Sequence, residues 1–525
     1  MLNRRGQLDR PQSFVFCQRF SQRTFLGLIL LVLVSGPAWA QKAASPEERT
    51  ARYFDSVRQQ PSLLMDFLHR MPKGADLHNH LSGSIYAETF VKWAVQDGLC
   101  IDKATLSFVA PPCDAASGKP PASVAYQDQV LYGHLLDAFS MRQFVPGAES
   151  GHDHFFASFG KFGLATNGHT AEMLAEVRSR SAAEHLQYLE LMFTPDGGDA
   201  ARLGAQVGWN DDLAKMREQI LAAGLPQIVA KTSKSLDEIE AKENEEMRCG
   251  KPQADPGCTV QARYLYQVLR GIPKQMVFAQ ILLGFEMASH DPRVVGLNLV
   301  MAEDWYVPIR DFNLHMQMLD FLHKLYPNVH ISLHAGELTP QLVPPEELFH
   351  IRASVELGHA ERIGHGVDAM REPDPAGLLR EMARKNVLVE ICLTSNDVIL
   401  NVTGTRHPLP MYLKFGVPVA LATDDAGVSR GSITQEYQRA AETYGLRYLD
   451  LKKMARASVT HSFLPGESLW KDQRPGHGGT TCAMTLAMDS VRPPSACSRL
   501  LETSEKARAE AALEMAFAEF ERTFR

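Results

Sequence analysis

The first candidates for chemistry in this sequence are two histidines separated by one residue, His78 and His80. They end a short apolar segment. In an extended strand, residues i and i+2 point to the same face, so both imidazoles can reach one metal ion. A motif this short also arises by chance, and a second pair, His152 and His154, follows no strand-like segment. We expect the second pair to belong to a lid or to packing rather than to a metal site.

Polar clusters follow three more strand-like segments further along the chain. They are His334-Ala335-Gly336-Glu337, Arg362-Ile363-Gly364-His365-Gly366 and Thr423-Asp424-Asp425. A single histidine after a strand is usually a satisfied polar residue, but packing alone favours apolar side chains at such positions. Four polar clusters after four separate strands therefore indicate a common site.

The elements that must position these clusters are short apolar, β-branched segments that alternate with amphipathic helical patterns, which is typical of a parallel sheet. The expected strands are Gly74–His78, Gln187–Phe193, Thr259–Leu269, Val294–Val300, Val329–His334, Glu361–His365, Val387–Leu393 and Pro418–Thr423. The expected helices include Asp211–Ala223, Pro273–Ala288, Ile309–Leu325 and Pro375–Lys385. Eight such units predict an α/β fold, the (β/α)₈ TIM barrel, in which the C-terminal strand ends meet at one mouth.

A minimal barrel needs only ~250 of the 525 residues. We expect the surplus in loop insertions near residues 100–150, 233–257 and 466–498. Each insertion contains or borders two cysteines, which predicts three disulfide staples: Cys100–Cys113, Cys249–Cys258 and Cys482–Cys497. Free surface thiols are the alternative. Cys392 lies within an expected strand and should be free, buried and unreactive.

The first 40 residues have the pattern of a secretory signal. Arg19 and Arg23 precede an apolar run over residues 25–34, and Ala38-Trp39-Ala40 supplies a cleavage site. The run is about half the ~20 residues that a membrane-spanning helix needs, so an anchor is the weaker alternative. We expect a single domain over residues 41–525, exported to the periplasm or secreted, with no stable membrane anchor after cleavage.

Charge and composition narrow the partners. The chain has 54 basic and 61 acidic residues, a formal net charge of −7, and 45% hydrophobic residues, which is ordinary for a globular protein. Nothing in this balance favours nucleic acid or an anionic membrane surface. A small or neutral substrate fits better, and the sequence does not indicate an oligomeric state.

The set H-N-H, S-L-H-A-G-E, R-I-G-H-G and A-T-D-D resembles the adenosine deaminase family, and the match runs from about Lys73 to Asp425. The segments Tyr188–Pro195 and 138–156 are similar to the secreted, growth-factor-related branch of that family. The resemblance implies one zinc ion, held by His78, His80, His334 and Asp424. Three neutral imidazoles and one carboxylate leave the ion a net positive charge, which lowers the pKa of a bound water from ~15.7 towards ~7.

The resemblance also implies roles around the purine ring. Glu337 would protonate N1, which makes C6 electrophilic, and His365 would orient or deprotonate the attacking water. Asp425 would hydrogen-bond N7, unless it only braces Asp424. The backbone N–H of Gly296 would meet N3, unless this glycine only relieves crowding inside the barrel. Ser395 and Asn396 are expected to brace neighbouring loops, without a catalytic role.

The implied reaction is hydrolytic deamination of adenosine and 2′-deoxyadenosine to the inosine products and ammonia. Two departures from the family pattern matter: Ser82 stands where many members have an acid that contacts the ribose, and Ala426 stands where they have proline. Another 6-aminopurine derivative is therefore an alternative substrate. A barrel metallophosphoesterase is a second reading, but its additional metal ligands are missing at Thr194–Pro195 and Met301–Asp304. An exported nucleoside-binding or signalling protein without activity is the third.

Overall fold

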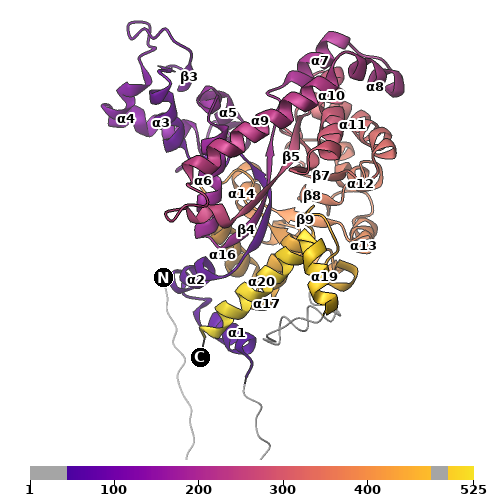
Figure 1. Cartoon of the computed structure of the whole chain (residues 1–525). Coiled ribbons are helices and arrows are strands. Elements are labelled where there is room, and N and C mark those ends of the chain that lie inside the picture. Colours follow the sequence, from indigo (N-terminus) through magenta and orange to yellow (C-terminus); the bar gives the residue numbers. More distant parts are fainter. Residues whose placement is uncertain (1–43, 474–494, 525) are drawn as a thin grey trace, which may run out of the picture. The chain divides into compact units, whose positions relative to one another are not determined.

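Eight parallel strands form the centre of the fold, in the order β1-β4-β5-β6-β7-β8-β9-β10 (Figure 1). Their bounds are Gly74–His80 (β1), Leu186–Phe193 (β4), Gln261–Leu269 (β5), Val294–Val300 (β6), His330–Ala335 (β7), Arg362–His365 (β8), Leu388–Ile391 (β9) and Val419–Leu421 (β10). The structure is a computed structural model that describes residues 44–473 and 495–524. All eight predicted strands are present, and the (β/α)₈ barrel is confirmed.

Most residues of the strands are buried because both faces of the sheet are covered, one by the barrel interior and one by helices. α10 packs on β5 and β6, and α17 packs on β10 and β1. The helices in and around the barrel are α6 (Thr170–Ala183), α7 (Asp199–Val207), α8 (Leu213–Ala222), α10 (Lys274–His290), α11 (Tyr306–Leu325), α12 (His350–Glu356), α13 (Pro375–Lys385), α14 (Leu393–Leu400), α15 (Leu409–Phe415), α16 (Ile433–Tyr444) and α17 (Tyr448–Thr460). The four helices predicted from the sequence correspond to α8, α10, α11 and α13.

The barrel closes between its first strand, β1, and Asp424, which follows its last strand, β10. The backbone N–H of Asp424 donates to the carbonyl of His78 at 2.8 Å, and the N–H of His80 donates to the carbonyl of Asp424 at 3.1 Å. Asn79 and Asp424 thus form a parallel bridge. The seam of the barrel is therefore made by the backbone of three predicted metal ligands.

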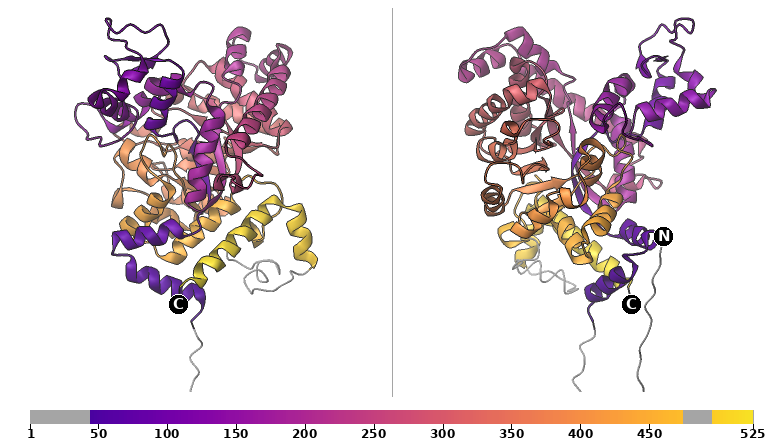
Figure 2. Two further views of the ribbon diagram at one scale, coloured as in Figure 1. Left: turned by 60° about the vertical axis from the view of Figure 1, so that its left-hand side comes forward. Right: turned by 180° about the vertical axis from the view of Figure 1, so that it is seen from behind.

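Helices at both ends of the described chain cover the base of the barrel (Figures 1 and 2). They are α1 (Pro46–Val57), α2 (Pro61–Arg70), α19 (Ser495–Thr503) and α20 (Glu505–Arg522). The guanidinium Nε of Arg49 in α1 donates to the carbonyl of Phe524 just after α20, at 3.0 Å. Among the described residues, no helix is both long and apolar enough to cross a membrane. The predicted signal over residues 1–40 lies outside the described residues.

The insertion near residues 100–150 forms a separate small sheet and a helix beside the barrel (Figure 2). β2 (Cys100–Asp102) pairs with β3 (Ser107–Val109) in antiparallel fashion, and α3 (Ala87–Gln96) and α4 (Gln129–Ala138) lie beside them. The predicted Cys100–Cys113 disulfide is present and holds this insertion. α5 (Gly151–Phe162) leads from the insertion back to the barrel.

The segment 233–257 is not a loop over most of its length, so this part of the sequence prediction is wrong. Its first part belongs to α9 (Leu225–Glu246), a helix of 22 residues. The stretch is rich in Lys, Glu and Ala, which favour helices, and Thr232, Leu236 and Glu243 recur on its buried face. The high charge that suggests a loop is the exposed face of this helix.

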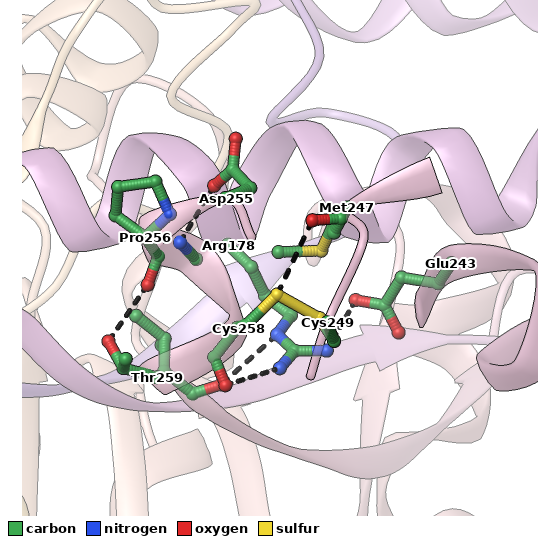
Figure 3. Close-up of a disulfide and its surroundings, with 10 residues drawn as sticks. Arg178, Glu243, Met247, Cys249, Asp255, Pro256, Cys258 and Thr259 are labelled. Atoms are coloured by element: carbon green, nitrogen blue, oxygen red, sulfur yellow. Dashed lines mark hydrogen bonds and ion pairs between the residues drawn. A yellow bond between two sulfur atoms is a disulfide. The ribbon is translucent and has the colours of Figure 1, made fainter. Parts of the chain in front are cut away.

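The predicted Cys249–Cys258 disulfide follows α9 and closes the turn that leads into β5 (Figure 3). Arg178 of α6 lies against this turn: its guanidinium donates to the backbone carbonyls of Val260 and Cys258 and pairs with Glu243 at 2.7 Å. The covalent link and the arginine together hold α6, α9 and the start of β5.

Two cysteine predictions remain. Cys392 is free and buried, as expected, and its burial raises the pKa of its thiol well above the ordinary value. It lies just after β9, because the chain turns into α14 at Leu393 sooner than predicted. Cys497 is disulfide-bonded, but Cys482 and much of the insertion near 466–498 lie outside the described residues. The Cys482–Cys497 pairing stays a prediction.

Candidate functional site

Three imidazoles from two strands converge at the mouth of the barrel. His78 and His80 come from β1 and His334 from β7. The Nε2 atom of His334 lies 3.0 Å from that of His78 and 3.1 Å from that of His80. His78 and His334 are almost inaccessible to solvent. Three ring nitrogens therefore share one small buried space.

An oxygen acceptor faces the other ring nitrogen of each imidazole. Nδ1 of His78 lies 2.7 Å from Oε2 of Glu390, Nδ1 of His80 lies 3.0 Å from Oε1 of Gln267, and Nδ1 of His334 lies 2.8 Å from Oδ1 of Asn298. Carboxylate and amide oxygens can only accept, so each Nδ1 carries the proton and donates it. All three Nε2 atoms then present lone pairs to one another.

Asp424 supplies a carboxylate oxygen to the same point. Its Oδ1 lies 3.4 Å from Nε2 of His78 and 3.3 Å from Nε2 of His80, and no hydrogen-bond donor among the described residues satisfies it. Oδ2 accepts a hydrogen bond of 2.7 Å from the hydroxyl of Ser395, which fixes the rotation of the carboxylate. Ser395 therefore braces the side chain of Asp424, whereas the sequence predicted that it braces neighbouring loops.

These donors fit a metal ion. Three lone pairs and a bare carboxylate oxygen in a buried space repel one another unless a cation lies between them. The donor atoms of His78, His334, His365 and Asp424 all lie within 4.8 Å of one another, and so do those of His80, Asp424 and Asp425. Neutral imidazoles with one carboxylate are a donor set that suits Zn²⁺.

A buried chain of charges supports His78 from below. Glu390 of β9 accepts from His78 and pairs with Nε of Arg362 at 2.7 Å, and Arg362 pairs with Glu190 at 2.6 Å. Burial alone would raise the pKa of Glu390, but the charge of Arg362 and the hydrogen bond from His78 lower it below its ordinary value. Glu390 therefore stays ionised and keeps the Nδ1 proton of His78 in place.

Glu337 lies two residues past the end of β7, on a loop held by Glu303. The carboxylate of Glu303 accepts the backbone N–H groups of Gly336 and Glu337 at 3.1 and 2.8 Å. The Glu337 carboxyl is itself buried, 3.7 Å from Nδ1 of His365. Burial, followed by the negative charges of Asp424 and Glu303, raises the pKa of Glu337 well above its ordinary value. The side chain is therefore suited to carry a proton at neutral pH.

A cavity of about 220 Å³ opens beside these groups. Its walls are mostly apolar and aromatic, and they include several of the polar groups described above. The lining residues are His80, Ser82, Phe155, Phe156, Phe159, Gln267, Leu269, Val300, Met301, Trp305, His334, Glu337, Asp424 and Asp425. Oδ1 of Asp425 has no hydrogen-bond partner among the described residues and lies against Gly83, where an added Cβ would come within 1.5 Å of it. No lysine or arginine is among the described residues that line the cavity.

Gly296 does not line this cavity. It lies inside β6, four residues before the strand ends, where an added Cβ would come within 2.6 Å of the backbone carbonyl of His330 and 3.2 Å of the ring of Phe463. The relief of crowding, left open from the sequence, explains this glycine, and the predicted contact with purine N3 is wrong. Met301, at the mouth end of the same strand, lines the cavity with a φ of 92°.

The second histidine pair lies in α5, apart from the metal-binding cluster. Nε2 of His152 lies 2.9 Å from a carboxylate oxygen of Asp304, and His154 contacts Glu149 and the carbonyl of Asp137. Three phenylalanines of the same helix line the cavity. The expected role in a lid or in packing agrees with these contacts.

Sequence reasoning missed Glu390, Asn298 and Gln267, the three acceptors behind the histidines. Glu390 and Asn298 are each a single polar residue inside an otherwise apolar strand, and Gln267 interrupts the apolar residues at the mouth end of β5. A polar side chain inside a barrel needs a buried partner, so this interruption of the apolar pattern could have identified all three.

Comparison with known proteins identifies the family. The family model described as adenosine deaminase matches residues 162–471, more than half of the chain. This chain belongs to the adenosine deaminase family. Its cluster of histidines and aspartate has the donor atoms that could hold a metal ion. The comparisons do not separate the growth-factor-related branch from the rest of the family, and that placement stays a prediction.

Several curated proteins are similar to this family member over part of their length. The adenosine deaminase of Pectobacterium atrosepticum is 35% identical over 179 residues, which cover 34% of this chain and 48% of that protein. The adenine deaminase of Chelativorans is 37% identical over 136 residues, 26% of this chain and 38% of that protein. The aminodeoxyfutalosine deaminase of Streptomyces coelicolor is 34% identical over 148 residues, 28% of this chain and 36% of that protein. The matched segments span less than half of these relatives.

Solved structures are similar to this family member at low sequence identity. The apo structure of the N6-methyl-AMP deaminase from Arabidopsis thaliana is 22% identical, with a TM-score of 0.47, and the match covers 76% of this chain and 94% of that one. The adenine deaminase from Arthrobacter aurescens is 18% identical, with a TM-score of 0.45, and the match covers 75% and 94%.

Proposed function

We propose that this chain is a zinc-dependent purine deaminase that converts adenosine and 2′-deoxyadenosine to inosine and 2′-deoxyinosine with release of ammonia. The observation that carries the proposal is the convergence of three Nε2 lone pairs and one carboxylate oxygen beside a buried carboxyl group, at the wall of a cavity. His78, His80, His334 and Asp424 would hold one Zn²⁺. When bound there, zinc supplies the lowered water pKa that hydrolysis at neutral pH requires.

The protein's own groups provide the proton transfer and the orientation. Glu337 protonates purine N1, which withdraws electrons from the ring and opens C6 to attack. Its raised pKa supports this role, because the group must carry a proton before it can donate one. Asp425 lines the cavity, and burial and the charge of Asp424 raise the pKa of its carboxyl group well above the ordinary value, so a protonated Asp425 can donate a hydrogen bond to purine N7. His365 orients the attacking water.

The cavity supports an uncharged substrate. Its apolar walls suit a planar base, and no cationic side chain among its described lining residues could pair with a phosphate. A nucleoside therefore fits better than a nucleotide. Ser82 lines the cavity where many family members have an acid for the ribose, and this supports a second candidate: a 6-aminopurine with a different or missing sugar.

Steady release of ammonia by the purified protein tests the proposal. Adenosine, 2′-deoxyadenosine, adenine and adenosine monophosphate should be compared before and after a chelator, and after zinc is returned. We expect turnover of the two nucleosides, little with the monophosphate, and loss and recovery with the metal. Preference for adenine would support the second candidate. Lack of turnover on every purine by protein that holds zinc would favour a binding protein instead.

A further inference from the structure

Asn396 lies between two buried histidines that the proposed chemistry leaves unconnected. It belongs to the first turn of α14 and is completely inaccessible to solvent. Its Nδ2 lies 3.0 Å from Nδ1 of His365, and its Oδ1 lies 3.0 Å from Nε2 of His407. One amide side chain thus joins a histidine of the site to a histidine outside it.

A backbone amide determines the donor-to-acceptor direction of these hydrogen bonds, which we call the relay from His407 through Asn396 to His365. The N–H of Leu409 donates to Nδ1 of His407 at 3.1 Å, and a backbone N–H is a donor that cannot reverse. Nδ1 of His407 is therefore a lone pair, and the proton of this ring is on Nε2. Burial lowers the pKa of His407 to about 4, so the ring is neutral at neutral pH.

The direction carries through Asn396. Nε2–H of His407 needs an acceptor, which places the carbonyl oxygen of Asn396 towards His407 and its NH₂ group towards His365. The reverse orientation would place an N–H of the amide against Nε2–H of His407. Nδ1 of His365 therefore accepts a hydrogen bond and carries no proton of its own.

This assignment decides which nitrogen of His365 can act. A neutral imidazole with an accepting Nδ1 has its proton on Nε2. Among the described residues, Nε2 of His365 has no hydrogen-bond partner, and the ring lies 4.9 Å from that of His78 and 5.3 Å from that of His334. His365 thus presents an unpaired N–H beside the metal-binding cluster, opposite in tautomer to the three imidazoles there.

We propose that Asn396 and His407 are positioning residues that hold His365 as an N–H donor to the attacking oxygen, so that His365 orients and stabilises this oxygen and does not remove a proton from it. The inference rests on the proposed function for the identity of that oxygen. It separates the two roles that the sequence left open for His365, and it gives Asn396 work at the site that the sequence did not predict.

Nitrogen NMR of the zinc-loaded protein with ¹⁵N-labelled histidine tests the tautomer directly. Couplings from ring carbon protons distinguish a protonated nitrogen from a bare one, and loss of a signal in His365→Gln assigns the resonances. We expect Nε2 of His365 to be protonated and Nδ1 to be bare. A proton on Nδ1, or on both nitrogens, would overturn the proposal. This NMR measurement needs neither turnover nor a substitution at Asn396 or His407.

Asn396→Asp reverses the relay with little change in size. A carboxylate can only accept, so Nδ1 of His365 must take the proton and Nε2 becomes bare. We expect the NMR signature of His365 to invert and kcat to fall roughly 10²–10⁴-fold, the range for a lost donor or a wrong tautomer. Zinc content and KM should stay near those of the unmodified protein. An inverted tautomer with unchanged kcat would contradict the positioning role.

Asn401→Asp is the matched control. It makes the same substitution five residues later, at the exposed C-terminal end of α14. It should leave kcat and the His365 signals unchanged. If Asn396→Asp does not fold, the spectrum of the unmodified protein still decides the tautomer. If the unmodified protein deaminates no purine, the proposed function fails, while the spectrum still judges the relay.

Discussion

His334 and Glu337 lie three positions apart, but different partners hold them. His334 turns one ring nitrogen to Asn298 and the other to the histidines of β1. Glu337 has no contact with those nitrogens that would make it part of the cluster, and the carboxylate of Glu303 fixes its backbone. Substitution of either residue should abolish activity, but for different physical reasons.

We expect His334→Ala to lose bound zinc, thermal stability and turnover together, because it removes a donor atom. Glu337→Gln should keep its zinc and its affinity for substrate-like ligands, since the amide retains the size of the carboxyl group. It cannot donate a proton to N1, so kcat should fall by at least the ~10²–10⁴-fold of general acid–base catalysis. Zinc content by atomic emission, thermal unfolding and ammonia release measure the three quantities.

Two results would contradict this assignment. Near-normal turnover of Glu337→Gln with zinc in place would move the acid role to another carboxyl group, such as Asp425 or Glu303. Loss of zinc from Glu337→Gln would make Glu337 a ligand or the brace of one.

The sequence predicts the acting groups of the site better than their supports. Strand ends are visible as polar clusters after apolar runs, and this pattern identified His334, His365 and Asp424. Asn396 sits in a helix whose start lies inside the predicted seventh strand, so no pattern placed it beside His365. The error at Gly296 has a different cause: the predicted strand Val294–Val300 already places this glycine four residues before the mouth, and its match to the family motif was preferred to that position.

At the scale of elements, α5 controls one wall of the cavity. Phe155, Phe156 and Phe159 line it, and Phe156 contacts Trp305 with ring centroids 5.9 Å apart. His152, in the first turn of α5, forms an ion pair with Asp304 in the loop after β6. This pair holds the start of the helix over the mouth.

We expect His152→Ala to raise KM roughly 3- to 10-fold with little change in kcat, since a partly buried charge-assisted contact contributes about 1 kcal/mol. Burial alone would lower the pKa of His152, but its bonds to Asp304 and Asp153 raise it above the ordinary value. The pair is therefore complete at acidic pH and weakens as pH rises through that raised pKa. Initial rates against pH should show KM rising over this range in the unmodified protein only.

His154→Ala is the matched control for that experiment. It removes an imidazole of the same helix whose partners lie in the segment before α5. A similar rise in KM for both variants would mean that the whole helix has loosened, and the pair with Asp304 would have no special part.

The Cys249–Cys258 disulfide should matter for stability and not for turnover. It closes a loop with a sequence separation of 9 and precedes β5, at the end of the barrel opposite the mouth. Conversion of both cysteines to serine should lower the free energy of unfolding by roughly 2–3 kcal/mol. Urea unfolding and ammonia release measure the two effects. An unchanged unfolding free energy would mean that the contacts of Arg178 suffice to hold the turn.

The sequence predicts the elements well where burial on both faces makes a strand almost entirely apolar, as in β6, whose bounds agree with the prediction. It fails where a pattern has two readings. In α9, charged residues on one exposed face are equally compatible with a loop, and only the buried Leu236 and Glu243 distinguish the helix. The end of β9 was predicted two residues late because Cys392 and Leu393 are as apolar as the strand before them.

At the scale of the whole molecule, we propose that the protein is exported and begins at Gln41 after cleavage. The apolar run over residues 25–34 and the Ala38-Trp39-Ala40 motif support this, and the disulfides agree with an oxidising compartment. Mass spectrometry of the protein from cell fractions should find Gln41 at the N-terminus and one titratable thiol after denaturation. An intact N-terminus in the cytosolic fraction would refute export, and three or more thiols would refute the third disulfide.

The seam of the barrel also sets an order of events during synthesis. The hydroxyl of Thr423 and the amide of Asn79 meet across it at 3.0 Å although they are 344 residues apart in the chain. A ribosome that adds ~5–20 residues per second needs roughly 20–70 s to make that stretch. At first the first strand has neither of its two neighbours, and after β4 is made one edge of it stays unpaired until the end of this time. The hazard for a newly made chain is therefore incorrect pairing at the open edge of this strand.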